Sequence, residues 1–294
     1  MTGRALEVDG DLRWVRVEGS GGPVVVFEPG IGDVGLTWGL VQPLVSEITT
    51  TFTHDRPGLG GSEPASGPRG VGAMVDDLRS TLSAAALHPP YLLVGHSFAS
   101  LTVRAFAHRF PEEVSGLLLV DGAHEDQMSR FPPELDPAPM LAGFAVQLRD
   151  LATRARSGET IPELTAVPES FTDDLADAYR SATAPTPIRL ETVAGEYEAL
   201  AQSQDEVRGL AARGHGDLPL LVMCHGVPQP VPGVSEEVNR RYEEVWQELQ
   251  AELAARSTAG EVQVAEGAGH MIHHQRPDLI VAALDRMIQG QGIE

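Results

Sequence analysis

A chain of 294 residues is long enough for one large α/β domain with an insertion, and its net charge of −21 opposes nucleic-acid binding, which needs a basic face. No run approaches about 18 consecutive apolar residues, and residues 1–7 lack the apolar stretch of a signal peptide. We therefore expect a cytoplasmic protein with no nucleic-acid or membrane partner. We also expect a monomer or homodimer, although neither charge nor hydropathy decides between them. The single cysteine, Cys224, leaves no intramolecular disulfide.

Strand and helix patterns alternate along most of the chain, as an open parallel sheet requires. Residues 12–17, where polar and apolar side chains alternate, predict an early edge strand. The predicted strands are residues 12–17, 24–27, 50–53, 91–94, 116–120, 218–224 and 261–265. Apolar stripes at helical spacing predict helices at residues 74–86 and 98–110, from Ser235 onward, and from Pro277 onward.

The segment from residue 124 to about residue 216 interrupts this alternation. It has no convincing strand, and its helical patterns lie near residues 140–156, 171–181 and 188–213. Because the segment is too long for a plain loop, we predict a helical cap inserted after the strand that ends at Val120. The predicted domains are a core of residues 1–123 and 217–294 and a cap of residues 124–216.

The pentapeptide Gly95-His96-Ser97-Phe98-Ala99 is the most informative part of the chain. A short buried strand that ends in Gly-x-Ser and passes at once into a helix holds the serine on a tight turn, with its hydroxyl exposed. Gly95 tolerates the backbone crowding of such a turn, and Ala99 is small enough for helix and strand to approach. This pattern predicts that Ser97 is a nucleophile, although a serine in a turn without chemistry is the simpler alternative.

A partner for Ser97 occurs late in the chain. His270 closes the loop Gly267-Ala268-Gly269-His270, directly after a predicted strand. Histidine is the side chain whose ordinary pKa suits a general base near neutral pH. His273 and His274 compete for this role, but they lie beyond the glycine-rich turn, so we predict His270.

These loops make the chain resemble the α/β-hydrolase family. Residues 28–32, Glu-Pro-Gly-Ile-Gly, resemble the family's His-Gly-x-Gly oxyanion loop, with Pro29 in place of the histidine. Residues 55–62, Asp-Arg-Pro-Gly-Leu-Gly-Gly-Ser, match its Asp-x-x-Gly-x-Gly-x-Ser loop. The turn at Ser97 resembles the family's Gly-x-Ser-x-Gly nucleophile elbow, with Ala99 in place of the last glycine. The resemblance implies a mostly parallel eight-stranded sheet flanked by helices, and an oxyanion hole formed by the backbone N–H groups of Ile31 and Phe98.

The acid that would orient His270 is less obvious, since residues 225–230, after the strand where the family most often supplies it, contain no carboxylate. A minority of the family places the acid after the family's sixth strand, which corresponds here to residues 116–120. Asp121 stands directly after that strand. Asp121 would leave the sheet at the same edge as Ser97 and His270, so we predict that it orients the imidazole. The alternative is that Asp121 only caps a loop. Other candidates for the acid are Glu125, Asp126 and Glu236.

Ligands of this fold bind at the carboxyl ends of the strands, beneath the predicted cap. Large apolar side chains of the cap are therefore candidates to line a substrate pocket, or they pack the cap against the core. The predicted substrate-binding residues are Met128, Phe131, Met140 and Phe144, with Leu148 and Phe171 as further candidates.

The resemblance and the motifs together predict a serine hydrolase that cleaves an ester, lactone or related acyl bond of a small, largely apolar molecule. The same residues could instead serve a specialised biosynthetic step, such as thioester release, cyclisation or carbon–carbon bond hydrolysis. A noncatalytic ligand-binding protein is a third possibility. Serine at the elbow differs from the aspartate nucleophile of the family's haloalkane dehalogenases and epoxide hydrolases. We expect no cofactor and no metal, because the histidines and the cysteine lack ligand spacing.

Overall fold

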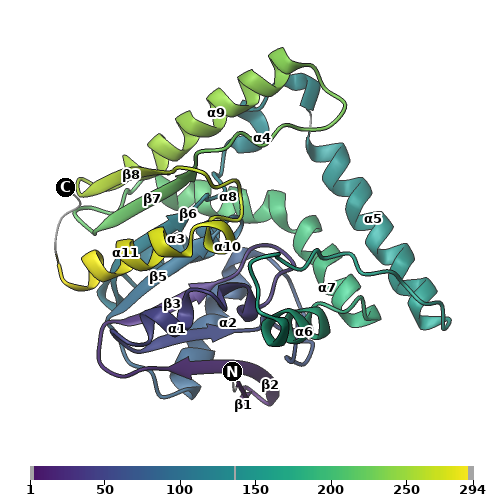
Figure 1. The fold of residues 1–294 in the computed structure, drawn as a ribbon, viewed down its shortest axis with the longest axis horizontal. Helices are drawn as coiled ribbons and strands as arrows, with labels where there is room; N and C mark the ends of the chain where they lie inside the picture. The colour runs from purple at the N-terminus through teal and green to yellow at the C-terminus, as the bar shows by residue number, and fades with distance from the viewer. Residues whose placement is uncertain (1–2, 136, 291–294) are drawn as a thin grey trace.

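The computed structural model describes residues 3–135 and 137–290, and a twisted eight-stranded sheet runs through its centre (Figure 1). The strand order is β1-β2-β4-β3-β5-β6-β7-β8, in which β2 is antiparallel to both neighbours and the other pairs are parallel. The strands are β1 (Arg4–Val8), β2 (Asp11–Glu18), β3 (Val24–Glu28), β4 (Thr51–His54), β5 (Tyr91–His96), β6 (Val114–Val120), β7 (Leu220–His225) and β8 (Gly260–Ala265). This sheet confirms the predicted α/β fold class.

The strand predicted at the edge of the sheet, residues 12–17, is β2, and its place at the edge was wrong. β1 lies outside it, with Val8 paired to Asp11. Asp9 and Gly10 form the connecting turn, both at positive φ (52° and 93°), as Asp-Gly favours in a two-residue hairpin. β1 gave no strand signal because it is short and Val8 is its only fully buried side chain.

Helices cover both faces of the sheet. Alternate side chains of the central strands point to opposite faces, so that one apolar cluster joins the sheet to α2, α3 and α8 and another joins it to α1, α10 and α11. The helices are η1 (Gly35–Trp38), α1 (Gln42–Val45), α2 (Val71–Ala84), α3 (Ala99–Arg109), η2 (Pro111–Glu113), α4 (Gln127–Arg130), η3 (Pro133–Leu135), α5 (Pro137–Arg156), α6 (Asp173–Ala182), α7 (Pro187–Glu198), α8 (Leu200–Ala211), α9 (Glu236–Ala254), α10 (Ile272–Gln275) and α11 (Pro277–Ile288). Within the described part of the chain, none of the helices combines the length and the apolar character needed to cross a bilayer.

Several helix boundaries follow directly from the sequence. Ser235 caps α9, because its Oγ accepts the N–H of Val238 at 3.3 Å. Thr186 caps α7 in the same way, and Pro187 fills the first helical position. Pro277 likewise opens α11. These signals place the starts of both late helices where the sequence predicts them.

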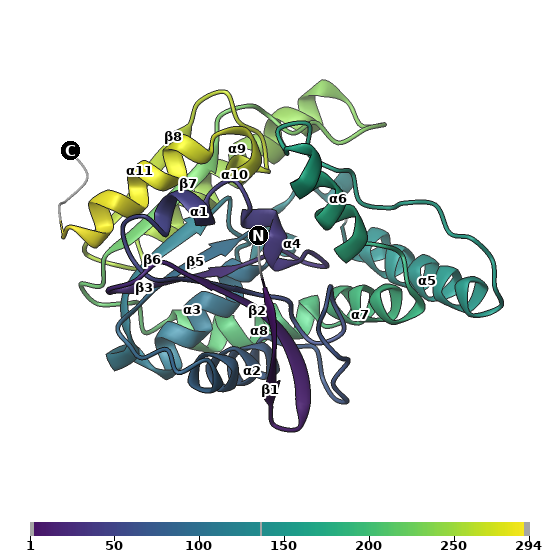
Figure 2. The same cartoon turned by 60° about the horizontal axis from the view of Figure 1, so that its bottom comes forward.

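The segment between β6 and β7 contains helices α4 to α8. Figure 2 shows α5, α6 and α7 grouped at one end of the sheet, and α5 packs along α7. A third apolar cluster joins these helices to Val34 and Leu59, in the loops that follow β3 and β4. The stretch predicted as one helix, residues 188–213, is divided at Ala199, because α7 packs on α5 whereas α8 packs on α2 and α3.

Candidate active site

Ser97 occupies a sharp turn between β5 and α3. Its φ of 52° lies in the left-handed region, which is uncommon and strained for a residue with a side chain. The Ser97 N–H donates to the carbonyl of Val120 on β6 at 3.0 Å, which fixes the turn to the neighbouring strand. A Cβ at position 95 would lie 2.8 Å from the carbonyl oxygen of Ala99, so the turn requires Gly95. Sequence reasoning predicted this glycine and this turn.

His270 lies on the loop between β8 and α10, and its ring contacts Asp121. The His270 Nδ1 atom is 2.6 Å from Oδ2 of Asp121. Since an ionised carboxylate only accepts hydrogen bonds, the proton of a neutral His270 ring lies on Nδ1 and the lone pair on Nε2. His96 holds this loop against the elbow, because its Nε2 atom lies 3.0 Å from the carbonyl oxygen of His270. Burial lowers the pKa of His96 to about 3, so that ring stays neutral.

The competing histidines are engaged elsewhere. The Nε2 atoms of His273 and His274 lie 3.0 and 2.9 Å from the hydroxyl of Thr37. Both rings are buried, and burial lowers the pKa of each. Of the three late histidines, His270 is the one that contacts Asp121.

Asp121 follows β6 directly and is fully buried. Its carboxylate accepts hydrogen bonds from His270 Nδ1, from the indole Nε1 of Trp246 at 2.9 Å, and from the backbone and ring nitrogens of His225. Burial alone would raise the pKa of Asp121, but the hydrogen bonds from His225 and His270 outweigh burial and hold that pKa well below its usual range. Asp121 is therefore an ionised carboxylate aimed at the ring of His270.

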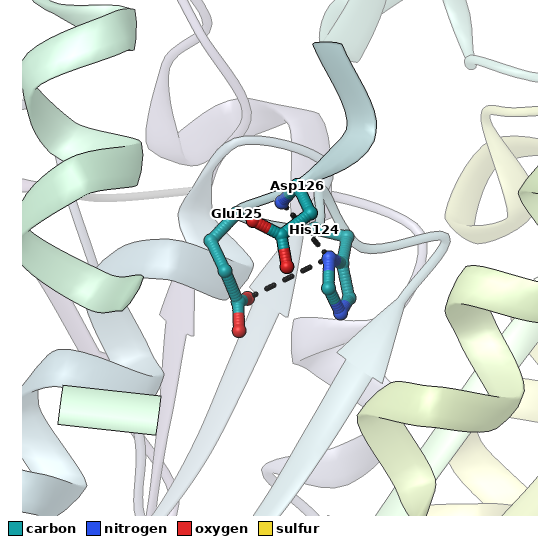
Figure 3. A group of neighbouring side chains, drawn as sticks. All are labelled: His124, Glu125 and Asp126. Atoms are coloured by element: carbon teal, nitrogen blue, oxygen red, sulfur yellow. Dashed lines mark hydrogen bonds and ion pairs between the residues drawn. The ribbon is translucent and has the colours of Figure 1, made fainter. Parts of the chain in front are cut away.

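The other candidate acids do not reach His270 in the part of the chain that the structure describes. Figure 3 shows Glu125 and Asp126 beside His124, in the loop between Asp121 and α4. Glu125 forms ion pairs with Arg104 at 2.7 Å and Arg256 at 3.0 Å. Asp126 pairs with Arg208, and Glu236 lies exposed in the first turn of α9.

The group of His124, Glu125 and Asp126 is also the place to test for a metal ion. Its potential ligand atoms lie within 4.8 Å of one another. Arginines already neutralise both carboxylates, however, and His124 Nδ1 accepts the backbone N–H of Asp126 at 3.0 Å. A cation would have to displace these partners, so the donor set fits a structural network better than a metal site. That the protein uses no metal stays a prediction.

A cavity of about 990 Å³ opens above Ser97, and both Ser97 and His270 line it. Its walls come from residues 30–33, the elbow, residues 164–170, helices α5 to α7 and the loop that carries His270. Among the described residues, no hydrogen bond joins the Ser97 hydroxyl to the His270 ring. Such a hydrogen bond often tightens only when substrate is bound. The cavity that Ser97 and His270 share is therefore what relates the two side chains in this structure.

Of the four side chains predicted to bind substrate, Phe144 lines this cavity. Met140 lies one helical turn earlier on α5 and is 61% exposed. Phe131 packs against Tyr242 of α9 with ring centroids 4.7 Å apart, and Met128 packs against the core of the sheet. The structure therefore places Phe144 at the cavity, whereas Met128 and Phe131 lie away from it because α4 packs against α9.

Two further candidates and several unforeseen residues complete the wall of the cavity. Leu148 lines it, whereas Phe171 packs in the third apolar cluster. Tyr179 and Arg189 also line it, and the Tyr179 hydroxyl donates to Asp33 at 2.8 Å. Polar residues scattered over helices and an irregular segment carry no periodic pattern, so the sequence offered no signal for them.

The loop after β3 is held by buried side chains on both sides. Arg56 donates to the carbonyl oxygens of Pro29 and Gly30, each at 2.7 Å. Glu196, on α7, accepts the N–H of Gly32 at 2.7 Å. Neither the N–H of Ile31 nor that of Phe98 donates to an acceptor within the described residues. Ile31 lines the cavity, and Phe98 directly follows Ser97 in the chain; that their N–H groups are oxyanion donors stays a prediction.

Comparisons with known proteins agree with this architecture. The chain is 26% identical over 270 residues to the Bacillus subtilis protein YqjL, covering 91% of this chain and 84% of that protein. A match of 37% identity over 116 residues to the "Probable transporter efuK" of Hormonema carpetanum spans 38% of this chain and 17% of that protein.

Solved structures share the fold at low sequence identity. The epoxide hydrolase CorEH aligns with a TM-score of 0.69 at 19% identity, covering 98% of this chain and 99% of that one. A thermophilic esterase from Thermogutta terrifontis aligns with a TM-score of 0.68 at 18% identity, covering 100% of both chains. The sequence pattern of the Alpha/beta hydrolase family matches residues 25–283, and the chain belongs to that family.

Proposed function

We propose that the protein is a serine hydrolase that cleaves an ester, lactone or related acyl bond of a small, largely apolar molecule. One observation carries the proposal: Ser97 and His270 line the same cavity, and His270 Nδ1 lies 2.6 Å from the buried carboxylate of Asp121. A serine, an oriented imidazole and an acid in this relation form the arrangement that activates a hydroxyl for attack on a carbonyl.

In this mechanism the Ser97 hydroxyl attacks the carbonyl carbon of the substrate while His270 Nε2 takes its proton. Asp121 keeps the Nδ1 proton in place and stabilises the imidazolium that forms. The N–H groups of Ile31 and Phe98 donate to the oxygen that becomes negative. His270 then gives its proton to the departing alcohol, and a water molecule, deprotonated by the same ring, releases the acid and restores Ser97.

The wall of the cavity supports a largely apolar substrate, since Ile31, Phe144 and Leu148 all contribute to it. We further propose that residues 124–216 act as a cap over Ser97, with α5, α6 and α7 closest to the cavity. A monomer or homodimer in the cytoplasm that acts on a small molecule remains our expectation.

A comparison of nucleophiles separates this function from epoxide hydrolysis. The family resemblance implies an aspartate nucleophile for the family's epoxide hydrolases, whereas residue 97 of this chain is a serine. A hydroxyl beside a histidine favours acyl transfer, because the acyl-serine that forms is released by water activated at the same ring.

The test is hydrolysis of p-nitrophenyl esters of increasing acyl length by the wild-type protein, Ser97→Ala and the control Ser83→Ala. Ser83 lies on the exposed side of α2, so its loss should leave turnover unchanged. Loss of the nucleophile should reduce turnover by about 10⁶-fold, to the assay background. Undiminished hydrolysis by Ser97→Ala would refute the proposal.

A further inference from the structure

His225 ends β7 with its ring between two carboxylates. Its Nδ1 atom is 2.9 Å from each oxygen of Asp121. Its Nε2 atom lies 3.0 and 3.1 Å from the oxygens of Glu243 on α9. The His225 residue is only 2% exposed, so water does not compete for either ring nitrogen. The same Asp121 carboxylate thus serves two imidazoles, those of His270 and His225.

This geometry fixes the charge of His225. An ionised carboxylate only accepts hydrogen bonds, so both ring nitrogens of His225 must donate, and a ring with two N–H groups is an imidazolium. Burial opposes the charge, but the hydrogen bonds and charges of Asp121 and Glu243 prevail and raise the pKa of His225 to about 9. The hydrogen bond from His225 also helps to lower the pKa of Glu243 against the effect of burial, so Glu243 stays ionised.

We propose that His225 is a positioning residue, a buried imidazolium clamped between Asp121 and Glu243 that fixes the carboxylate which orients His270. This inference rests on the proposed function of Ser97, His270 and Asp121. The connection runs from Glu243, a mostly buried residue of α9, through His225 to Asp121. Because each link joins opposite charges, each hydrogen bond is charge-assisted and stronger than a neutral one.

The titratable groups around His225 come from every element that packs against it. Asp121 follows β6, His270 lies on the loop after β8, and Glu243 belongs to α9. Cys224 and Tyr242 stay uncharged at the pH where His225 loses its proton, because burial raises the pKa of the Cys224 thiol to about 11 and that of Tyr242 to about 12. Loss of the His225 proton at alkaline pH would therefore leave one ring nitrogen with a lone pair facing the carboxylate of Asp121 or Glu243. The repulsion would loosen Asp121.

The experiment follows the rate at which a fluorophosphonate labels Ser97 between pH 6 and 10.5. In the wild-type protein the rate should fall on the alkaline side as His225 loses its proton. Glu243→Gln removes one of the two charges that hold this proton, so the alkaline midpoint should move down by about one pH unit. The control Glu244→Gln alters the next, exposed residue of α9 and should leave the midpoint in place.

A second variant separates charge from hydrogen bonding. The side-chain N–H of an asparagine can stand near the position of His225 Nδ1, so His225→Asn keeps a neutral donor to Asp121. Labelling should slow about tenfold, and the alkaline decline should disappear. His88→Asn, an exposed histidine changed in the same way, should retain the wild-type profile.

The ring itself gives a readout that does not depend on activity. Nitrogen-15 NMR of the wild-type protein at pH 7 should show two N–H groups on His225, and a single N–H would overturn the inference. Labelling with the same alkaline midpoint in wild type and Glu243→Gln would overturn it as well. If the wild-type protein is not labelled at Ser97 at all, the proposed function fails, and the role of His225 in it fails too.

Discussion

The guanidinium of Arg56 and the carboxylate of Glu196 form a buried ion pair, with Nε and Oε1 2.8 Å apart, across 140 positions of the chain. Arg56 follows β4, and Glu196 belongs to α7. Both side chains also hold the loop after β3, through the carbonyls of Pro29 and Gly30 and through the N–H of Gly32. The helix above the cavity and the loop that carries Ile31 are thereby fixed by one network.

Removing Glu196 should destabilise the protein strongly. Glu196→Ala leaves the Arg56 charge buried without its main partner, and we expect the free energy of unfolding to fall by about 3–5 kcal/mol. The control is Glu198→Ala on the same helix, whose ion pair with Arg149 is about half exposed. That change should cost at most about 1 kcal/mol. Urea unfolding measures both values, and equal losses would contradict the role given to Glu196.

Replacing Asp121 should reduce turnover far more than stability. Asp121→Asn presents an amide to His270 and favours the wrong tautomer of the ring, so kcat should fall by as much as about 10⁴-fold. Asp126→Asn is the matched control, since Asp126 pairs with Arg208 near the surface. A loss below about tenfold in Asp121→Asn would shift the role of the acid to another carboxylate.

Residues that a local pattern specifies could be predicted, and residues placed by tertiary contacts could not. The turn at Ser97 follows from a buried strand, a glycine and a small residue within five positions, which is local information. Asp121 was predicted as the acid from the family resemblance and because parallel strands deliver their carboxyl ends to one edge of the sheet. β1 escaped prediction because it is short and mostly exposed.

The wall of the cavity was the least predictable part of the site. Apolar composition identified Phe144 and Leu148, but it could not tell them from Met140 or Met128. Which side of α5 faces the cavity depends on how that helix packs along α7, a contact between segments that are distant in sequence. His225 gave no functional signal either, since a histidine at a strand end becomes informative only when both of its carboxylate partners are in place.

The position of Phe144 predicts a selectivity change. Phe144→Ala enlarges the cavity, so the preferred acyl chain of the substrate should become longer, with each added methylene worth on the order of 1 kcal/mol in kcat/KM. Met140→Ala, one turn away and 61% exposed, should leave the preference unchanged. The ratio of kcat/KM across a p-nitrophenyl ester series measures the effect. Identical ratios in Phe144→Ala and wild type would place the acyl group elsewhere in the cavity.

The raised pKa of His225 predicts how stability depends on pH. A group that binds its proton more tightly when folded stabilises the protein fully below its unfolded pKa of about 6.5, and this stabilisation is lost as pH rises through the folded pKa of about 9. A shift of this size corresponds to a loss on the order of 3 kcal/mol between pH 6.5 and 9.5.

Glu243→Gln isolates this contribution from that of His54, whose pKa is also raised, against the effect of burial, by the charge of Glu28. Both proteins contain the His54 pair, so the difference between their pH profiles reports on His225. The variant should be less stable than wild type at pH 6.5 and should lose less stability on the way to pH 9.5, so that the two curves converge. Urea unfolding at pH 6.5, 8 and 9.5 measures this, and parallel curves would mean that His225 carries no extra proton in the folded protein.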